Sequence, residues 1–334
     1  MKNKYDVIII GAGPGGLACA EELKNSALSV LLLEKNNTIG PKVCAGGLTR
    51  LDAGFNLPKD KSREFKTQHI FVNGKEHNLQ LAYPLKTISR TKLGQFQLKK
   101  LQGAKNIDIQ TNTAVLEIKA DRIITQDGII DFKYLVGADG SNSLVRKYLK
   151  LPSSQNMGLY YDLDLLSNKF EWHINTKAWG SAYLWVFPHL DHTNIGFHFN
   201  PKLISAASAK KILDQFLRDN NYVFRKENFR SAPLNYNYQG FSFGSVFLVG
   251  DAAGLVSKAT GEGITMALIS GKEIAHKLLN PQYSVTKLHN VIKIMQRHTK
   301  MIDRFDRHPR LQSTFFWLFL KMMKSQRFQE YFGN

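Results

Sequence analysis

The sequence predicts an α/β fold that joins a Rossmann-type nucleotide-binding domain to a second, mostly antiparallel β-sheet domain and a helical C-terminus. Three observations predict it. A strand, a glycine loop, a helix and a second strand follow one another over Tyr5–Lys35, residues 157–200 alternate with the period of β-strands, and residues 281–334 combine basic and aromatic side chains. With 334 residues and a hydrophobic content of 43%, the chain can fill the core of one large domain or of two ordinary ones.

The opening stretch has the spacing of a dinucleotide-binding fingerprint. Gly11, Gly13 and Gly16 fit G-x-G-x-x-G directly after the apolar run Val7–Ile10, and Glu34 follows the second apolar run. The first glycine permits a tight turn, the second lets the backbone approach a pyrophosphate, and the third lets helix and strand pack closely. The helix N-terminus stabilises phosphate charge, and the carboxylate can accept hydrogen bonds from an adenosine ribose. This pattern alone does not separate FAD from NAD.

A loop with three glycines and a proline follows over residues 36–50. Such a loop lets the backbone approach a flat ligand, and Cys44 would lie near that ligand or be a small loop residue with no chemistry. The pair Asn73-Gly74 between alternating runs predicts a hairpin within residues 66–90. Arg90 precedes a predicted helix, where it could meet a phosphate or a flavin or form a surface salt bridge. That helix covers Thr91–Leu101, and short strands are predicted after it at Ile107–Ile109, Ala114–Ile118, Arg122–Thr125 and Ile129–Phe132.

Two further apolar strands end in Gly/Asp turns that open helices. Asp139 follows the first of these strands, within residues 134–146, and Asp251 follows the second. The long helix after the second turn begins near Gly261 and Gly263, and its electropositive end would stabilise negative charge on a reduced flavin. Because strands of an open α/β sheet present side chains to ligands at their carboxyl ends, both aspartates are expected near a ligand.

Residues 157–200 are predicted to form the second sheet and are the aromatic part of the chain. A sheet with one aromatic face is a good wall for an apolar ligand, and Tyr183, Trp185 and Phe187 are the candidates to line it. The alternative is that these rings fill the core of the sheet. Its strands are expected at Leu159–Leu165, Phe170–Ile174, Ala182–Phe187 and Thr193–Phe199, before an amphipathic helix at 205–219.

The net charge of +18 indicates an anionic partner or serves solubility alone. Residues 281–334 carry ten Lys and Arg against three Asp and Glu, around the aromatic run Phe315–Leu320. This segment suits an anionic membrane surface, or it packs its rings into the body of the protein; no nucleic-acid module is found, so we expect no nucleic-acid partner. The sequence has no signal peptide, no apolar run near the roughly 20 residues of a membrane span and no disulfide framework. We therefore expect a cytoplasmic protein, with peripheral contact at the inner face of the membrane as a further option, and no metal site.

The motifs together resemble those of known flavoproteins. The glycine loop with Glu34, GADGSNSLVR (137–146) and VGDAAGLV (249–256) are similar in order and spacing to the three FAD-binding motifs of the aromatic-hydroxylase-type flavoproteins. Three more segments are similar to motifs of the geranylgeranyl reductase family, although Ala45 stands where that family usually has glycine. These segments are KVCAGGL (42–48), YLWVFP (183–188) and GEGI (261–264).

The resemblance implies an FAD-dependent oxidoreductase that reduces carbon–carbon double bonds of an isoprenoid lipid or quinone chain, by hydride transfer from N5 of the reduced flavin. The substrate would be a long-chain isoprenoid or another apolar small molecule. A flavin-dependent monooxygenase or a halogenase-like enzyme acting on an aromatic substrate is the alternative, and a non-enzymatic lipid-binding flavoprotein is a third. The electron donor, NAD(P)H or a redox protein, stays open.

The resemblance also implies roles for individual residues and a division into domains. Cys44 would lie near the flavin ring as the candidate catalytic residue, and Tyr183, Trp185 and Phe187 would line the substrate cavity. The implied FAD-binding residues are Gly11, Gly13, Pro14, Gly15, Gly16, Glu34, Lys35, Cys44, Ala45, Gly46, Arg90, Val115, Asp139, Gly250, Asp251, Gly261, Gly263 and Ile264. The FAD-binding domain would comprise residues 1–65, 86–150 and 240–280, the substrate domain 66–85 and 151–239, and the basic, aromatic C-terminal helices 281–334.

Overall fold

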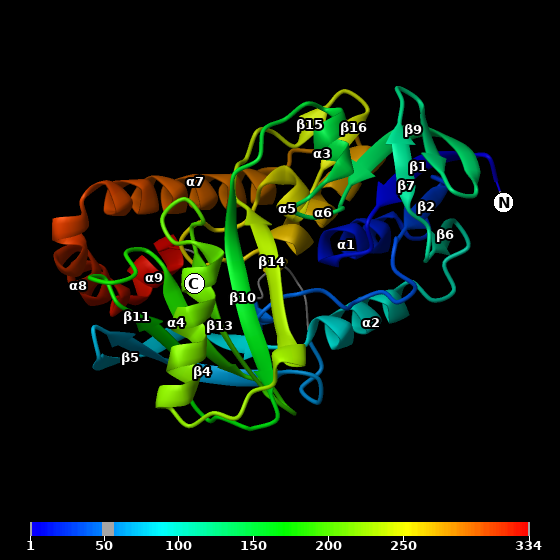
Figure 1. Cartoon of the computed structure of the whole chain (residues 1–334). Helices are drawn as coiled ribbons and strands as arrows, with labels where there is room; N and C mark the ends of the chain where they lie inside the picture. Colours follow the sequence, from blue (N-terminus) through cyan, green and yellow to red (C-terminus); the bar gives the residue numbers. More distant parts are fainter. Residues whose placement is uncertain (1, 49–56, 333–334) are drawn as a thin grey trace.

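The computed structural model describes residues 2–48 and 57–332, which form two β-sheets surrounded by helices (Figure 1). The first sheet has the order β15-β16-β9-β1-β2-β6, and β7 and β8 join it through β9. Its strands are β1 (Lys4–Ile10), β2 (Val30–Leu33), β6 (Ile107–Gln110), β7 (Val115–Ile118), β8 (Arg122–Thr125), β9 (Gly128–Gly137), β15 (Ser242–Phe243) and β16 (Val246–Leu248).

The centre of the first sheet is parallel. β1 lies between β2 and β9, with Val7 opposite Val30 on one side and Tyr134 on the other. Strands β6 and β16 extend the parallel set outward. A parallel sheet is covered on both faces, so its strands are continuous apolar runs rather than alternating ones. The predicted Rossmann-type α/β fold is confirmed.

Helices α1 (Pro14–Leu23) and α6 (Ile264–Leu279) pack against each other beside this sheet (Figure 1). Their backbones come so close that a Cβ atom on Gly271 of α6 would lie 2.1 Å from the carbonyl oxygen of Gly15. Three more helices follow strands or loops of the same part of the chain: α2 (Arg90–Lys100), α3 (Leu144–Tyr148) and α5 (Gly250–Ala253).

The second sheet has the order β14-β10-β13-β12-β11-β4-β5-β3. Its neighbours are antiparallel except β11 and β4, which are parallel. The predicted hairpin is present, with both Asn73 and Gly74 in left-handed conformations at its turn. The strands are β3 (Gly47–Leu48), β4 (Arg63–Val72), β5 (Lys75–Thr87), β10 (Gln155–Leu163), β11 (Glu171–Ile174), β12 (Tyr183–Pro188), β13 (Thr193–Phe199) and β14 (Phe229–Asn235).

Aromatic side chains occupy both faces of the second sheet, whereas one aromatic face was expected. On one face Tyr161 and Phe197 form a core with Leu213 of helix α4 (Ala206–Asp219). On the other face Tyr160 and Trp185 belong to a separate cluster. Because successive side chains of a strand point to opposite faces, neighbouring aromatic residues fall into different environments. The alternative that the aromatic rings fill the core of the sheet is therefore correct for the first face. A short turn of helix, η1 (Lys226–Asn228), precedes β14.

The C-terminal helices lie against the second sheet (Figure 1). They are α7 (Thr286–Arg307), α8 (Gln312–Met323) and α9 (Gln326–Phe332), with the short η2 (Pro309–Leu311) before α8. Leu320 and Met323 are buried in the aromatic cluster, while Trp317 and Leu318 are 52% and 48% exposed. Thus α8 packs one side into the body and leaves another side in solvent. No helix within the described residues has the length and apolar character needed to cross a bilayer.

We propose two domains, one around each sheet; β3 (Gly47–Leu48) and the first residues of β4, within the predicted segment 1–65, already belong to the second sheet. Residues 66–85 lie within the β4–β5 hairpin of the second sheet, and residues 242–248 return to the first sheet. Part of the proposed segment 1–65, residues 49–56, lies outside the described residues.

Replacing Gly271 by alanine is expected to lower the thermal unfolding midpoint. The new methyl group would overlap the Gly15 carbonyl oxygen and force α1 and α6 apart, which costs about 1–3 kcal/mol in a packed core. Differential scanning calorimetry measures the shift. Gly158→Ala is the control, because its Cβ would meet Leu234 and Trp185 at 3.5 and 3.7 Å, ordinary contact distances. Equal midpoints for the two variants would contradict the expectation.

Candidate active site

The glycine loop after β1 exposes the N-terminus of α1 at the edge of the first sheet. Gly11 has a φ of +103°, and a Cβ there would lie 2.5 Å from the Ala138 carbonyl oxygen, so the turn requires glycine. A Cβ on Gly13 would meet nothing closer than that same oxygen, at 3.9 Å. The helix starts with Pro14 and has no side-chain cap among the described residues. Its N–H groups can therefore bind a phosphate in the open space before Gly13.

Glu34 lies at the carboxyl end of β2 and holds the glycine loop. Its Oε2 accepts a hydrogen bond from the Ala12 N–H at 3.0 Å, and its Oε1 accepts from the backbone and side chain of Asn36. The backbone of Thr113 donates to the Glu34 carbonyl oxygen, which brings the segment leading to Val115 beside it. Lys35 is exposed. The carboxylate is thus oriented next to the phosphate-sized space.

Asp139 caps a helix rather than standing free at the end of its strand. Its Oδ2 accepts hydrogen bonds from the N–H groups of Leu144 and Val145, at 2.6 and 3.2 Å. Ser143 is the N-cap residue of α3 and accepts from the Arg146 N–H. Burial raises the pKa of Asp139, and the hydrogen bonds from Ser143 and the backbone only partly offset it. The interactions of Asp139 in the described structure are therefore internal, and they fix the turn after β9.

Asp251 is an ionised carboxylate next to the site. Burial alone would raise its pKa, but the charge and hydrogen bond of Lys42, the hydrogen bond of Ser141 and the charge of Arg90 together leave the pKa below its ordinary value. Lys42 Nζ lies 3.2 Å and Ser141 Oγ 3.0 Å from Oδ2. Asp251 follows Gly250 at the start of α5, so it is presented directly from the carboxyl end of β16.

Arg90 has the environment of an anion-binding side chain. It is only 8% exposed, which argues against the surface salt bridge considered above. Within residues 2–48 and 57–332 its guanidinium has no hydrogen-bond or ion-pair partner, and its Nε is fully enclosed. An enclosed cation without a partner is costly, so the residue fits a bound anionic group such as the FAD pyrophosphate.

A second helix N-terminus faces the same region. The N-cap residue of α6 is Gly263, and no side-chain cap is found there among the described residues. A Cβ on Gly263 would lie 3.2 Å from Asp251 Oδ1, and one on Gly261 would lie 3.1 Å from the Tyr183 hydroxyl. Glycine at positions 261 and 263 therefore leaves the N-terminal end of α6 open to a ligand. The side chain of Ile264 lies next to this opening.

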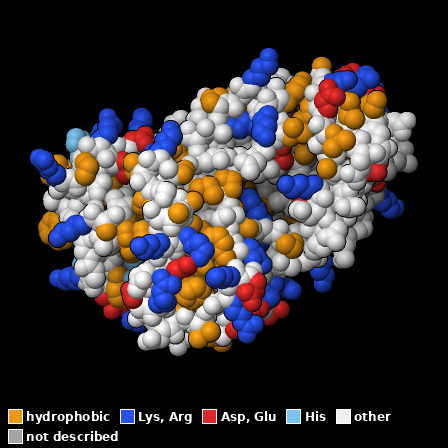
Figure 2. All heavy atoms as spheres, viewed as in Figure 1, with side chains coloured by type: hydrophobic (Ala, Val, Ile, Leu, Met, Phe, Trp, Pro, Cys, Tyr) orange, Lys and Arg blue, Asp and Glu red, His pale blue; other side chains and the backbone are white. Residues whose placement is uncertain are grey.

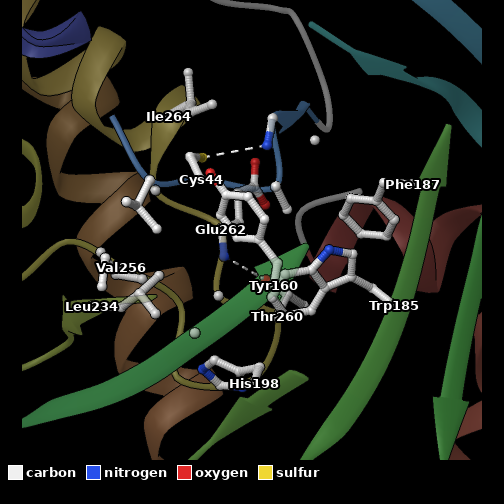
Figure 3. A pocket seen from close by; sticks show the side chains of 18 of the residues that line it. Cys44, Tyr160, Trp185, Phe187, His198, Leu234, Val256, Thr260, Glu262 and Ile264 are labelled. Atoms are coloured by element: carbon white, nitrogen blue, oxygen red, sulfur yellow. Dashed lines mark hydrogen bonds between the residues drawn. The ribbon is translucent and has the colours of Figure 1, made fainter. Parts of the chain in front are cut away.

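These elements surround a cavity of about 150 Å³ between α6 and the second sheet, hereafter the active-site cavity. Figure 3 shows Cys44 and Ile264 on one side of it, Trp185 and Phe187 on another, and His198 below. All three predicted substrate residues line it, including Tyr183. So do nine other predicted site residues: Pro14, Cys44, Ala45, Gly46, Arg90, Asp251, Gly261, Gly263 and Ile264. The remaining predicted residues lie outside its lining: Gly11, Gly13, Gly15, Gly16, Glu34, Lys35, Val115, Asp139 and Gly250.

Most titratable rings of the active-site cavity are uncharged at neutral pH. Burial lowers the pKa of His198 to about 4. His189, which lies behind the Cys44 loop and outside the cavity lining, has its pKa lowered to about 4 by burial and the nearby His192. Burial also raises the pKa of Tyr183, and burial with the charge of Asp162 raises that of Tyr160 to about 12. The aromatic side of the cavity thus carries no charge, and its phenols stay protonated, while Lys42, Arg90 and Asp251 line another part.

Several lining residues were missed by sequence reasoning. Tyr160 and His198 line the active-site cavity, and Lys42 and Ser141 hold Asp251. Lys42 lay within the quoted cysteine-loop motif, so that motif was a usable signal for it. Tyr160 could have been found only by knowing which face of β10 it occupies. No group of three or more potential metal ligands is found in the described part of the chain.

Comparison with protein families supports the cofactor. A family model described as a pyridine nucleotide-disulphide oxidoreductase matches residues 5–154. A second model, described as an FAD binding domain, matches residues 89–282, more than half of the chain.

Curated relatives come from archaea. An uncharacterised protein of Methanosarcina barkeri is 30% identical over 290 residues, which cover 80% of this chain and 73% of the relative. A protein of Methanocella arvoryzae named digeranylgeranylglycerophospholipid reductase is 26% identical over 319 residues, covering 84% and 79% of the two chains.

Solved structures show the same fold. A geranylgeranyl bacteriochlorophyll reductase-like protein of Thermoplasma acidophilum has a TM-score of 0.73 at 21% identity, over 98% of this chain and 90% of its own. A p-nitrophenol 4-monooxygenase of Pseudomonas putida has a TM-score of 0.77 at 16% identity, over 99% and 97%. The chain therefore belongs to the FAD-binding-domain family, resembles the geranylgeranyl reductases within it, and is an FAD-dependent oxidoreductase.

Proposed function

We propose that this oxidoreductase reduces C=C bonds of an isoprenoid, geranylgeranyl-type lipid or quinone chain. The observation that carries the proposal is the active-site cavity, in which apolar and aromatic side chains face the Cys44 loop and the open end of α6. The relative named digeranylgeranylglycerophospholipid reductase supports this substrate class. When bound, reduced FAD supplies the hydride.

The chain's own residues would hold the cofactor from both ends. We assign the pyrophosphate to the N-terminus of α1 and to Arg90, and the adenosine ribose to Glu34. The open N-terminus of α6, after Gly263, would stabilise negative charge on the flavin ring. Asp251, with Lys42 beside it, would bind the ribityl chain or the pyrophosphate. The two helix N-termini, Arg90 and Lys42 would together provide positive potential for an extended anionic cofactor.

The aromatic side of the cavity would position the alkene and exclude water. Tyr183, Trp185 and Phe187 project from one strand, β12, and are each less than 9% exposed. Their rings offer dispersion contacts to a polyene chain and present no charge to it. Holding one double bond against the cofactor lowers the entropic part of the barrier, and excluding water prevents side reactions.

The second carbon of the alkene requires a proton, and we assign its source to Cys44. The thiol lines the active-site cavity, and the Gly46 N–H donates a hydrogen bond to its Sγ at 3.4 Å. That hydrogen bond would stabilise the sulfur after the proton leaves. Solvent then restores the thiol proton, so that one hydride and one proton are consumed for each reduced bond. His198 and His189 are neutral at pH 7, so neither starts as an imidazolium acid.

Peripheral contact with an anionic membrane stays a prediction. Exposed Trp317 and Leu318 on α8 lie in the basic C-terminal segment, and Lys321 Nζ is 4.4 Å from the Trp317 ring. Figure 2 shows Lys and Arg side chains around the end of the molecule formed by these helices. Such a surface suits anionic headgroups, and sedimentation with anionic vesicles, compared with neutral vesicles, measures the binding.

The electron donor is NAD(P)H or a redox protein, and assaying reduction of the flavin by each of them identifies it.

Arg90→Gln is expected to weaken FAD binding by about 1.5–3 kcal/mol, the usual contribution of a charged hydrogen bond. The apoprotein should lose little stability, because the guanidinium has no hydrogen-bond or ion-pair partner among the described residues and acts on Asp251 through its charge alone. Fluorescence titration of apoprotein with FAD gives the affinity. Arg218→Gln, at an exposed position of α4, is the control. Unchanged affinity in Arg90→Gln would remove its assigned role.

Photoreduced enzyme, mixed anaerobically with geranylgeranyl lipids, is expected to become reoxidised while the lipid gains two hydrogens per turnover. Absorbance at the flavin band measures the reoxidation, and mass spectrometry measures the hydrogens gained by the lipid. If no isoprenoid reoxidises the flavin, the proposed function is wrong. Oxygen consumption stimulated by an aromatic compound would instead favour the monooxygenase alternative, to which the fold similarity also extends.

Cys44→Ala is expected to slow this reoxidation by about 10²-fold, the lower end for loss of a general acid. FAD content should stay at the wild-type level, because the variant keeps the backbone of the loop. Cys44→Ser keeps a proton at the same place and should recover part of the rate. Wild-type turnover in Cys44→Ala would retire the catalytic role.

A further inference from the structure

A second cavity lies beneath the C-terminal helices, beside the active-site cavity. It measures about 540 Å³ and is called the C-terminal cavity here. Its sheet side contains Ile70 and Trp172, and its helical side contains Met301 of α7 with Phe316 and Phe319 of α8. None of these three helical residues lines the active-site cavity. The C-terminal cavity is therefore a space made by packing α7 and α8 on the second sheet.

The two cavities share a wall. Gln68, Trp172, Tyr183 and Thr260 line both of them. The Tyr183 hydroxyl donates to the Thr260 carbonyl oxygen at 2.5 Å, and the ring of Trp172 packs 5.1 Å from that of Tyr183. In contrast, Gln68 Nε2 and Trp172 Nε1 are buried without an acceptor among the described residues. Turning these two side chains would break no hydrogen bond of those atoms, so opening the wall there would cost packing contacts, such as that of Trp172 with Tyr183, rather than hydrogen bonds of those atoms.

A long substrate needs more volume than the active-site cavity offers. The active-site cavity, at about 150 Å³, is below the roughly 300–1,000 Å³ of typical small-molecule sites, and the flavin ring must share it. The C-terminal cavity, at about 540 Å³, lies within that range. A short apolar group fits the first cavity, whereas a chain of several isoprene units needs both.

The outer part of the C-terminal cavity carries positive charge. Arg297, Lys300 and Arg304 line it from one side of α7, at spacings of three and four residues. All three are exposed, and no carboxylate pairs with them in the described part of the chain. Arg297 lies over the ring of Tyr331, at 4.3 Å. Like charges at this spacing repel, and a bound anion would relieve that repulsion.

We propose that the C-terminal cavity holds the part of a long isoprenoid substrate that lies beyond the reacting bond, with the anionic end group of that substrate bound by Arg297, Lys300 and Arg304. The chain then passes the wall at Trp172 and Tyr183 and places a double bond in the active-site cavity. This inference rests on the proposed function. It identifies the substrate class as a long prenyl chain ending in a phosphate or diphosphate group.

Met301→Trp tests the apolar part of the proposal, because the larger ring would fill the C-terminal cavity without touching the active-site cavity. We expect kcat/KM for geranylgeranyl diphosphate to fall at least about tenfold, while that for dimethylallyl diphosphate, a single isoprene unit, stays unchanged. Gln296→Trp is the matched control, since it adds the same ring at an exposed position of α7 outside the cavity. Equal changes for long and short substrates, or no change for either, would overturn the proposal.

Lys300→Glu tests the charged part. The KM for geranylgeranyl diphosphate should rise at least about tenfold at low salt, with that for the uncharged geranylgeraniol unchanged. Arg310→Glu, on η2 and outside the cavity lining, makes the same charge change as a control. Equal effects of Lys300→Glu on the charged and uncharged substrates would refute the end-group site, and this variant also decides the proposal if Met301→Trp does not fold.

A binding measurement distinguishes failure of this inference from failure of the proposed function. Native mass spectrometry of the holoenzyme measures retention of geranylgeranyl diphosphate without turnover. If the wild type reduces no isoprenoid, the proposed function fails; retention lost in both Met301→Trp and Lys300→Glu would still support the cavity. If the wild type reduces isoprenoids and both variants retain geranylgeranyl diphosphate as it does, the cavity proposal fails while the proposed function stands.

Discussion

Helices α1 and α6 touch backbone to backbone, and the site depends on this contact. Gly271 faces the Gly15 carbonyl oxygen with no room for a side chain between them. Because α1 follows β1 and α6 follows the Asp251 turn, the contact brings two helix N-termini from distant parts of the chain to one region. Neither end carries a side-chain cap within the described residues. Two sets of unsatisfied N–H groups thus point toward a shared space.

The charge distribution around that space is incomplete without an anion. Arg90 is enclosed and has no hydrogen-bond or ion-pair partner in the described structure, and Lys42 is paired with the Asp251 carboxylate. Other acids serve the framework: Glu34 holds the glycine loop and Asp139 caps α3. An extended dinucleotide with a pyrophosphate would supply the missing negative charge, and the FAD-binding-domain family match identifies that dinucleotide as FAD.

The apolar half of the site comes from the second sheet. Alternation along its strands sends one set of rings to the α4 core and another set toward the active-site cavity. The C-terminal helices then enclose further apolar volume on that same side. The groups proposed for the cofactor and those proposed for the substrate thus belong mainly to different sheets, and we expect the chemistry where they meet, at the Cys44 loop and the start of α6.

Local sequence determined the parts whose structure depends on neighbouring residues. The strand, glycine loop, helix and acid over Tyr5–Lys35, the Asn73-Gly74 hairpin and the Asp139 turn could all be predicted, because backbone conformation and short-range periodicity encode them. Tertiary structure alone decided which rings face the cavity, since a shift of one residue along a strand reverses the face. It also paired Lys42 with Asp251 across 209 residues, left Arg90 enclosed without a hydrogen-bond or ion-pair partner in the described chain, and created the C-terminal cavity. These features depend on how distant elements pack, and no local pattern encodes that.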